Sequence, residues 1–278
     1  MIQQLLAYRD GIYLPKDKIS IGTDDLGFER GFAVFDYCRE RNGTIPFLKE
    51  HLSRLEHSQS LLRLHSKAHM EDVKNILETL QKENNLNNSY FKCIISARMV
   101  DNKLTAILTV YQDIFKEYDQ KMFNDGITLI LHEFAKPFPE YKTTFYLGSL
   151  REYDRMLENN SEDILFYFDN IVRECSRCNI FIIKGGLIYT PDKNILKGVT
   201  RHHVMHCLKE QFMVIEKDIS IKELFEADEV FISSTTKNIM PVVKIEDQMI
   251  ANGAPGNITK LLIPLFENYC NKYVADRN

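Results

Sequence analysis

Residues 171–201, IVRECSRCNIFIIKGGLIYTPDKNILKGVTR, form the stretch that decides most about the fold. Residues 180–183 and 187–189 are short apolar runs on either side of a Gly-Gly pair, a pattern typical of a β-hairpin. Residues 198–201 then lead into a helical pattern. The first turn of a helix leaves backbone N–H groups without intrahelical acceptors at the positive end of the helix dipole, which suits a phosphate. Most Gly-x-Thr helix starts are simple caps, so this stretch alone leaves both interpretations open.

Composition indicates a globular protein with a small partner. The 278 residues are 44% hydrophobic, which allows a sizeable core, and the length favours two domains of ordinary size. Lys and Arg number 35 against 39 Asp and Glu, so the net charge of -4 offers no bulk attraction to nucleic acid or to an anionic membrane. We therefore expect a small-molecule ligand, no nucleic acid and no membrane partner.

The cysteines and the N-terminus indicate the compartment. Six cysteines include Cys175-x-x-Cys178, which alone suggests a zinc or redox pair, but no second CxxC completes a metal site. We predict no metal, and free thiols in a reducing compartment. The run MIQQLLAYRDG is too short for a signal peptide, and no stretch of about 18 apolar residues could span a bilayer. The expected location is cytoplasmic.

The N-terminal part predicts a small domain of strands and helices over residues 1–113. Asp10-Gly11, between two apolar runs, is a hairpin turn signal. From residue 46 the period becomes helical, with His51 and Arg54 beside the apolar stripe, where an arginine usually only snorkels. The further elements expected here are strands at 32–37, 90–98 and 104–111 and a helix at 70–81.

A polar segment, residues 114–125, shows no sustained strand period, and we expect an interdomain linker there. Residues 126–278 predict a second α/β domain. In it a helical pattern begins just after Lys142, and an amine near the positive end of a helix dipole would have a lowered pKa and nucleophilic character. Ser234-Thr235-Thr236 follows a strand expected over 229–233, and three hydroxyls at a strand end either cap it or bind an anion.

Taken in order along the chain, several short blocks resemble the class IV aminotransferase family of pyridoxal-phosphate enzymes. That group holds branched-chain and D-amino-acid aminotransferases and aminodeoxychorismate lyase. The matching blocks are GFERGFAVFDYCRERNG, EHLSRL, KTTFYL, ECSRCNIF, LIYTP, ILKGVTR and SSTTKNIMPV. The resemblance implies an α/β (α+β) two-domain fold of type IV, with a small N-terminal α/β sandwich domain and a larger C-terminal pseudo-barrel α/β domain. It also implies pyridoxal 5'-phosphate between the domains and a homodimer.

The resemblance also implies roles for individual residues toward the cofactor. Lys142 matches the lysine that forms a Schiff base with the cofactor and moves the proton during transfer. Glu174 matches the carboxylate that faces the pyridine nitrogen and keeps it protonated. The phosphate-binding positions match Arg54, Thr200 and Thr235, with Ser234 beside them and the backbone N–H groups of Val199 and Thr200 at the helix start.

Substrate positions match the family less closely. The residues that the resemblance places near the substrate are Phe35, Arg39, Arg98, Tyr146 and Thr236. Phe35 replaces the tyrosine that D-amino-acid aminotransferases place on the substrate carboxylate, and their Arg-x-His trap has no counterpart in residues 99–104. Phe145 replaces the asparagine usual three residues after the lysine. A D-amino acid is therefore disfavoured, and a branched-chain-like L-amino acid is favoured as donor to a 2-oxo acid.

Three functions stay open on the sequence. The leading one transfers an amino group between an amino acid and a 2-oxo acid, with Lys142 as the base. A lyase that converts aminodeoxychorismate into pyruvate and 4-aminobenzoate would use the same lysine, so the motifs do not separate the two. The third is a family member that binds an anionic metabolite without catalysis.

Overall fold

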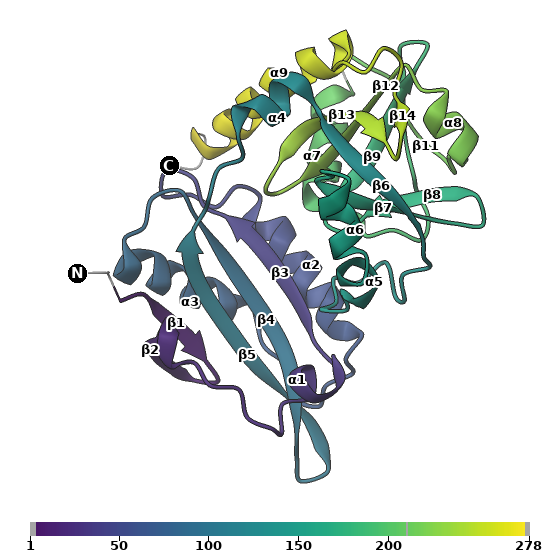
Figure 1. The fold of residues 1–278 in the computed structure, drawn as a ribbon. Coiled ribbons are helices and arrows are strands. Elements are labelled where there is room, and N and C mark those ends of the chain that lie inside the picture. Colours follow the sequence, from purple (N-terminus) through teal and green to yellow (C-terminus); the bar gives the residue numbers. More distant parts are fainter. Residues whose placement is uncertain (1–3, 210, 276–278) are drawn as a thin grey trace. The chain divides into compact units, whose positions relative to one another are not determined.

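The structure of the chain, a computed structural model, describes residues 4–209 and 211–275 (Figure 1). The chain forms two compact units. The first contains the chain up to Lys116 together with Tyr141–Phe145, and the second contains Glu117–Glu140 and the chain from Tyr146 onward. Because Tyr141–Phe145 belong to the first unit, Lys142 lies there and not in the C-terminal domain where it was expected.

The first unit is an antiparallel sheet with helices packed on one face. Its elements are β1 (Leu6–Arg9), β2 (Ile12–Pro15), η1 (Lys16–Lys18), α1 (Leu26–Arg30), β3 (Val34–Arg39), α2 (Leu48–Ser60), α3 (Met70–Asn84), β4 (Ser89–Val100) and β5 (Lys103–Ile114). The strand order is β2-β1-β5-β4-β3. Alternate side chains of β4, such as Phe91, Cys93 and Ile95, are buried against apolar residues of α2 and α3, which lie on the same face of the sheet (Figure 1). The intervening side chains of β4, among them Tyr90, Lys92 and Ile94, lie on the opposite face.

The second unit is built on one curled sheet. Its elements are α4 (Gln120–Asp125), β6 (Ile127–Glu133), α5 (Leu147–Leu150), α6 (Tyr153–Glu158), β7 (Asp163–Phe168), β8 (Ile171–Cys175), β9 (Asn179–Lys184), β10 (Leu187–Thr190), α7 (Val199–Leu208), β11 (Val214–Glu216), α8 (Ile221–Phe225), β12 (Glu229–Ser234), β13 (Asn238–Ile245), β14 (Gln248–Met249) and α9 (Asn257–Ala275). The strand order is β11-β10-β9-β12-β13-β6-β7-β8, with β14 paired to β13. β8 is the last strand in this order, and residues 176–178 connect it directly to β9. Because β9 lies near the other end of the order, the sheet curls back on itself.

Two segments differ from the sequence-based expectation. The expected linker, residues 114–125, contains the end of β5 and all of α4, and the units divide after Lys116. α4 forms in this polar stretch because the Asp119 carboxylate caps it by accepting the Lys121 N–H at 2.9 Å. The single helix expected directly after Lys142 is two short helices, α5 and α6, the first of which begins only at Leu147. The argument that a helix dipole activates Lys142 therefore does not apply.

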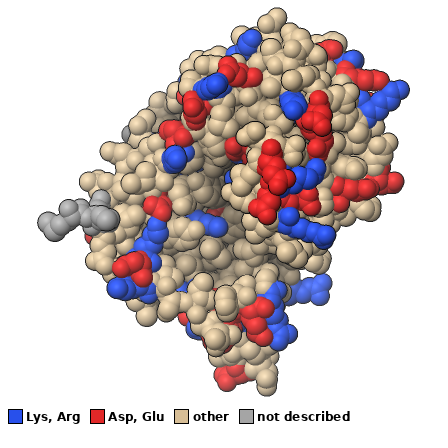
Figure 2. Space-filling model, in the orientation of Figure 1, with Lys and Arg blue, Asp and Glu red and all other residues tan. Residues whose placement is uncertain are grey.

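The surface carries charges of both signs. Figure 2 shows Lys and Arg side chains interspersed with Asp and Glu over the face drawn, in keeping with the net charge of -4. Within residues 4–209 and 211–275, none of the helices combines the length and the apolar character needed to cross a bilayer.

Candidate active site

Lys142 lies in an extended segment that is fixed to the edge of the first unit's sheet. β3 is the last strand in the order, and its outer edge pairs with this segment through an antiparallel bridge between Val34 and Thr143. The Phe35 N–H donates to the Lys142 carbonyl at 2.9 Å, and the Lys142 N–H donates to the Ser58 hydroxyl of α2 at 3.0 Å. These bonds explain why the segment belongs to the first unit, and they fix the main chain of Lys142 on both sides.

The amine of Lys142 shares an aromatic ring with a second lysine. Its Nζ lies 4.7 Å from the centroid of the Phe35 ring, and the Nζ of Lys92 lies 5.0 Å from the same centroid. Burial lowers the pKa of Lys92. Among the described residues, none forms a hydrogen bond or an ion pair with the Lys92 side chain. Two amines thus flank Phe35, and one of them has its charge available for a ligand.

Next to Phe35, β3 places Asp36 in a buried cluster of charges. Arg54 donates to both carboxylate oxygens, from Nε to Oδ2 at 2.7 Å and from Nη2 to Oδ1 at 2.8 Å. Burial would raise the pKa of Asp36, but the charge of Arg54 and the contact with His51 outweigh it and hold that pKa well below its usual range. Burial lowers the pKa of His51, so its ring is neutral at pH 7 and donates from Nδ1 to Oδ1 of Asp36 at 2.8 Å. The arginine expected at the phosphate is therefore held by a permanent anion.

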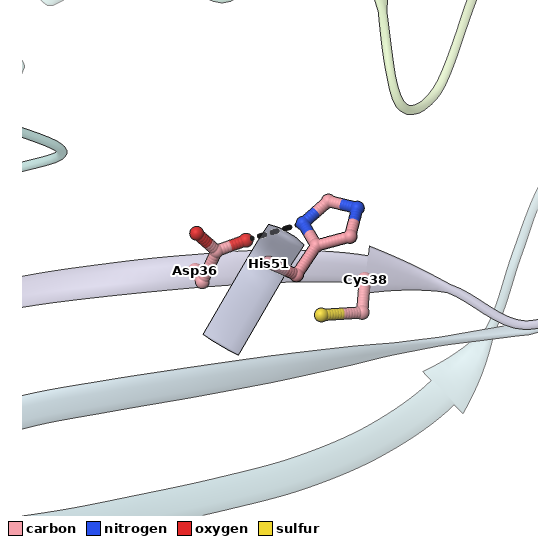
Figure 3. Close-up of side chains that lie close together, drawn as sticks. All are labelled: Asp36, Cys38 and His51. Carbon is pink, nitrogen blue, oxygen red and sulfur yellow. Dashed lines mark hydrogen bonds and ion pairs between the residues drawn. The ribbon is translucent and has the colours of Figure 1, made fainter. Parts of the chain in front are cut away.

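Asp36, Cys38 and His51 also form a group of three potential metal ligands, whose ligand atoms lie within 4.8 Å of one another (Figure 3). A cation there would have to displace Arg54 from Asp36 and deprotonate Cys38, whose pKa burial raises well above its usual value. We therefore interpret the group as the anchor of Arg54.

On α7, His202 and His206 lie four residues apart at exposed positions, but two ligands do not complete a metal site.

Glu174 lies on β8 in the second unit and is only 5% exposed. One carboxylate oxygen, Oε1, lies 3.1 Å from the Lys136 ammonium, and the other, Oε2, accepts the Leu196 N–H at 3.0 Å. An ammonium and a peptide N–H both favour the ionised form of a carboxylate. A buried carboxylate with these partners is suited to hold a proton on a ring nitrogen.

The start of α7 is positioned by the close approach of the Gly198 main chain to the Asn179 side chain. The backbone there is extended, at φ -64°, but an added Cβ would lie 2.3 Å from Oδ1 of Asn179, so only glycine fits. Asn179 in turn donates from Nδ2 to the Leu196 carbonyl at 2.8 Å. Val199 and Thr200 begin the helix with N–H groups that have no acceptor within it. The helix start thus offers donors to an anion.

The turn between β12 and β13 offers a second set of donors. The Ser234 hydroxyl lies 3.2 Å from the Thr236 hydroxyl and accepts the Lys237 N–H at 3.2 Å. In the described part of the chain, no hydrogen bond uses the backbone N–H of Thr235 or Thr236. Asn179 joins the two donor sets, because it pairs with the strand end of β12 and also contacts Gly198.

The arginines expected at the substrate already bind residues of the first unit. Arg39, the last residue of β3, donates from Nη2 to Oδ1 of Asn88 at 3.1 Å, and its guanidinium carbon lies 3.9 Å from the centroid of the Phe115 ring. Arg98 pairs with Asp10 at 2.7 Å. Both guanidinium groups are thus engaged by structural partners.

The other expected substrate residues divide between the units. Phe35 lies in the first unit, whereas Tyr146 and Thr236 lie in the second. Phe145, which replaces the family's asparagine, lies in the first unit and is 39% exposed. Burial raises the pKa of Tyr146, and the carboxylates of Asp163 and Glu174 raise it further. The Tyr146 hydroxyl therefore stays protonated and can act as a hydrogen-bond donor.

Sequence reasoning did not assign a role to four residues that the structure places at these positions: Asp36, Lys92, Lys136 and Asn179. Asp36 and Asn179 lie inside the quoted blocks GFERGFAVFDYCRERNG and ECSRCNIF, so their position in a motif was the available signal. Lys92 alternates with buried residues of β4 and therefore faces the side of the sheet away from the helices. Nothing in the sequence around Lys136 indicates that it pairs with Glu174.

Comparison with known proteins places these features in a family. A sequence profile described as Amino-transferase class IV matches residues 33–245. A D-alanine aminotransferase of Listeria monocytogenes is 29% identical over 264 residues, which cover 90% of this chain and 91% of that protein. A putative branched-chain-amino-acid aminotransferase of Methanocaldococcus jannaschii is 31% identical over 281 residues and 96% of each chain.

Solved structures give the same fold. The Escherichia coli branched-chain amino acid aminotransferase has a TM-score of 0.87 at 20% identity, over 96% of this chain and 94% of that one. The branched-chain amino acid aminotransferase of Thermobaculum terrenum, solved in its PLP form, has a TM-score of 0.85 at 20% identity, over 97% and 95% of the two chains. The predicted fold of type IV is confirmed by this likeness.

Proposed function

The chain belongs to the class IV aminotransferase family and is a pyridoxal-phosphate-dependent aminotransferase, and on that premise we propose that it transfers an amino group from a branched-chain-like L-amino acid to a 2-oxo acid. We assign Lys142 as the reactive residue because its main chain is held in place by hydrogen bonds. Its N–H and its carbonyl are both hydrogen-bonded, and its amine lies against the Phe35 ring. The main chain of this lysine is thus fixed, and its amine lies beside one aromatic ring.

The donor and acceptor groups of each unit fit parts of pyridoxal phosphate. The first unit offers the Lys142 amine for an aldehyde and the Arg54 guanidinium, held by Asp36, for a phosphate. The second unit offers the buried Glu174 carboxylate for a protonated ring nitrogen. It also offers the α7 start and the Ser234–Thr236 turn, which carry N–H and hydroxyl donors suited to a phosphate dianion.

The protein residues supply binding, orientation and proton transfer. When bound, pyridoxal phosphate supplies an electron sink that makes the α-proton of an amino acid acidic. Lys142 Nζ takes that proton and returns it, acting as general base and acid. Glu174 holds a proton at the ring nitrogen, and the phosphate donors keep their positions throughout because they belong to a helix start and a tight turn.

Two features of the first unit support an L-amino acid over a D-amino acid. β4 and β5 meet in a tight turn in which Val100 pairs with Lys103 and the two residues between them have φ of 47° and 59°. Neither this turn nor the strand ends beside it, residues 99–104, contain an Arg-x-His sequence. Phe35 has no hydroxyl to offer a substrate carboxylate. The likeness to D-alanine aminotransferases makes the D-enantiomer the competitor to test against.

Lys92 supports an acceptor with a second carboxylate. Its ammonium lies on the same aromatic ring as the Lys142 amine and has no anionic partner among the described residues. A half-buried ammonium gains more from a ligand carboxylate than an exposed one does, because water screens it less. We therefore propose that the amino-group acceptor is a dicarboxylic 2-oxo acid.

A homodimer is the assembly we propose for this enzyme. The first unit contains a groove of about 380 Å³ whose exposed surface is mostly apolar, with Ile21, Phe28 and Ile94 in its lining beside polar and charged side chains. Phe28 is 70% exposed and Ile21 is 57% exposed, which favours a covering partner. We propose a second copy of the chain as that partner. Sedimentation should give a dimer for the native chain and a monomer for Phe28→Glu; a monomeric native chain would contradict this assembly.

The test of the proposed reaction is a donor screen with the purified full chain and pyridoxal phosphate. We expect L-leucine, L-valine and L-isoleucine to convert the bound cofactor into pyridoxamine phosphate, followed by absorbance, and D-alanine to do so much more slowly. Faster conversion by D-alanine would reverse the enantiomer assignment. No conversion by any amino acid, together with pyruvate release from aminodeoxychorismate, would establish the lyase instead.

A further inference from the structure

A fully buried ammonium lies directly behind the turn expected to meet the phosphate. Lys237 follows Thr236 in the β12–β13 connection, is 1% exposed, and none of its side chain reaches solvent. Its Nζ lies 3.3 Å from Oε1 of Glu162 and 4.9 Å from the centroid of the Tyr118 ring. Burial lowers the pKa of Lys237, but Cys178 and then Asp163 raise that pKa beyond its usual value, so the amine stays charged.

The anion next to this lysine is Asp163, which is 0% exposed. The Ser176 hydroxyl donates to Oδ1, and Oδ2 lies 3.6 Å from Nε of Arg177. Burial raises the pKa of Cys178 to about 11, so its neutral thiol faces Oδ2 at 3.5 Å as a weak donor. Lys237 and Arg177 thus lie around a pair of acidic residues at the start of β7.

This cluster ties together the two connections that carry cofactor residues. Ser176 and Arg177 form the turn after β8, the strand of Glu174, and Lys237 ends the turn of Ser234–Thr236. Glu162 and Asp163, at the start of β7, contact both turns. A displacement of either turn would break a contact to the same two acidic residues.

Such a cluster is costly to bury and needs a reason other than stability. Removing ions from water costs several kcal/mol per ion, and a well-packed apolar replacement is often neutral or stabilising. Buried ion pairs are better explained by the geometry they specify than by their net energy. Here the geometry specified is that of a tight turn in which the N–H groups of Thr235 and Thr236 form no hydrogen bond with the described residues.

We propose that Lys237, paired with Glu162 beside Asp163, is a positioning residue that holds the Ser234–Thr236 turn in the conformation that binds the cofactor phosphate. The inference rests on the proposed use of pyridoxal phosphate and adds a residue to its phosphate site. Lys237 does not touch the ligand in this arrangement. It fixes the turn whose N–H groups and hydroxyls do.

The experiment compares pyridoxal phosphate with pyridoxal, which lacks the phosphate. Dissociation constants for both are measured by absorbance on the full chain and on Lys237→Met, Lys237→Arg and Lys244→Met. Lys244 lies on the same hairpin, is partly exposed and pairs with Asp247, so Lys244→Met is the matched control. We expect Lys237→Met to weaken pyridoxal phosphate binding about tenfold and pyridoxal binding hardly at all, with Lys237→Arg recovering most of the loss.

Two outcomes overturn the inference. Equal weakening of both ligands by Lys237→Met indicates a general structural role, and no weakening of either indicates no role. If Lys237→Met does not fold, Glu162→Gln removes the partner of the ammonium at a partly exposed position and carries the same expectation. A native chain that does not bind pyridoxal phosphate would instead contradict the proposed function, so the two failures are distinct.

Discussion

The two units each bury an aspartate beside an arginine, but they direct the charges differently. Asp36 in the first unit holds Arg54 in two hydrogen bonds, and Arg54 is itself the group expected at the phosphate. In the second unit, Arg177 and Lys237 lie around Asp163, behind a turn whose own donors are neutral N–H and hydroxyl groups. On the proposed roles, the first unit presents a cation to the cofactor, and the second uses cations to shape a set of dipoles.

This difference suggests that chemistry and recognition are distributed unequally. The amine of Lys142, proposed as the reactive group, and the guanidinium of Arg54 belong to the first unit, and most neutral donors belong to the second. Loss of a first-unit residue should therefore remove reaction or charge. Loss of a second-unit residue should mainly change geometry and cofactor affinity.

The largest expected effect is that of Lys142→Ala. General acid–base catalysis by one residue contributes up to about 10⁴-fold, and we expect kcat to fall by about that factor. Because the phosphate donors remain, the variant should still bind the cofactor, without a borohydride-reducible adduct. Lys103→Ala, at an exposed position of the same unit, is the control and should keep full activity. A reducible adduct on Lys142→Ala would contradict the role of this lysine.

The next effect tests whether Asp36 is the anchor of the first unit's cation. Removing one partner of a buried ion pair destabilises a protein by about 3–5 kcal/mol, and Asp36→Asn leaves Arg54 buried without its anion. Urea unfolding measures the loss. Asp113→Asn breaks the half-exposed pair with Lys16 in the same unit and should cost at most about 1 kcal/mol. Equal losses for the two variants would remove the distinction.

The pH dependence of the same variant follows from the sign of the shift. The pKa of Asp36 is lower in the folded than in the unfolded chain, so its stabilising contribution is complete above the unfolded value of about 4 and is lost as pH falls below it. Between neutral pH and about pH 5 the Asp36 carboxyl is ionised in both the folded and the unfolded native chain, so its own titration adds no pH dependence to the difference in unfolding free energy from Asp36→Asn. Below about pH 4 the two should converge.

A smaller effect tests the geometric role of the second unit. Gly198→Ala would bring a Cβ to 2.3 Å from Oδ1 of Asn179. Overpacking of this kind costs about 1–3 kcal/mol, and displacement of the α7 start should weaken pyridoxal phosphate more than pyridoxal. Asn179→Ala removes the clashing atom, so the double variant should be less impaired than the two single effects predict. Strict additivity would show that the close approach does not position the helix.

The sequence predicted this second unit better than the placement of Lys142. The hairpin and helix start in residues 171–201 were predicted correctly because glycine and proline punctuate that stretch locally. Lys142 was expected at a helix start in the C-terminal domain, since apolar residues at helical spacing follow it. The open edge of β3, a contact between residues about a hundred positions apart, decided otherwise, and no local pattern reports such a contact.

The buried clusters of charged residues were also not predicted from the sequence. Asp163 and Lys237 are ordinary charged residues in the sequence, and only the packing of three connections brings them together. Glu174, Thr200 and Thr235 could be named because they lie in contiguous motifs. Lys136 pairs with Glu174 but lies in none of these motifs, so the sequence did not indicate it.

The smallest expected effect asks whether the first unit presents a second cation to the ligand. Lys92→Met keeps the length of the side chain but removes its charge, and we expect the KM of a dicarboxylic 2-oxo acid such as 2-oxoglutarate to rise about tenfold. The KM of a monocarboxylic 2-oxo acid should change little, because it offers nothing to the ammonium. Burial lowers the pKa of Lys92, so the preference of the native enzyme for the second carboxylate should decline at alkaline pH before that of an ordinary lysine would. Equal changes in both KM values would mean that Lys92 packs on Phe35 and does not bind the second carboxylate of the substrate. Arg54 would then be the main cation that the first unit offers to a ligand.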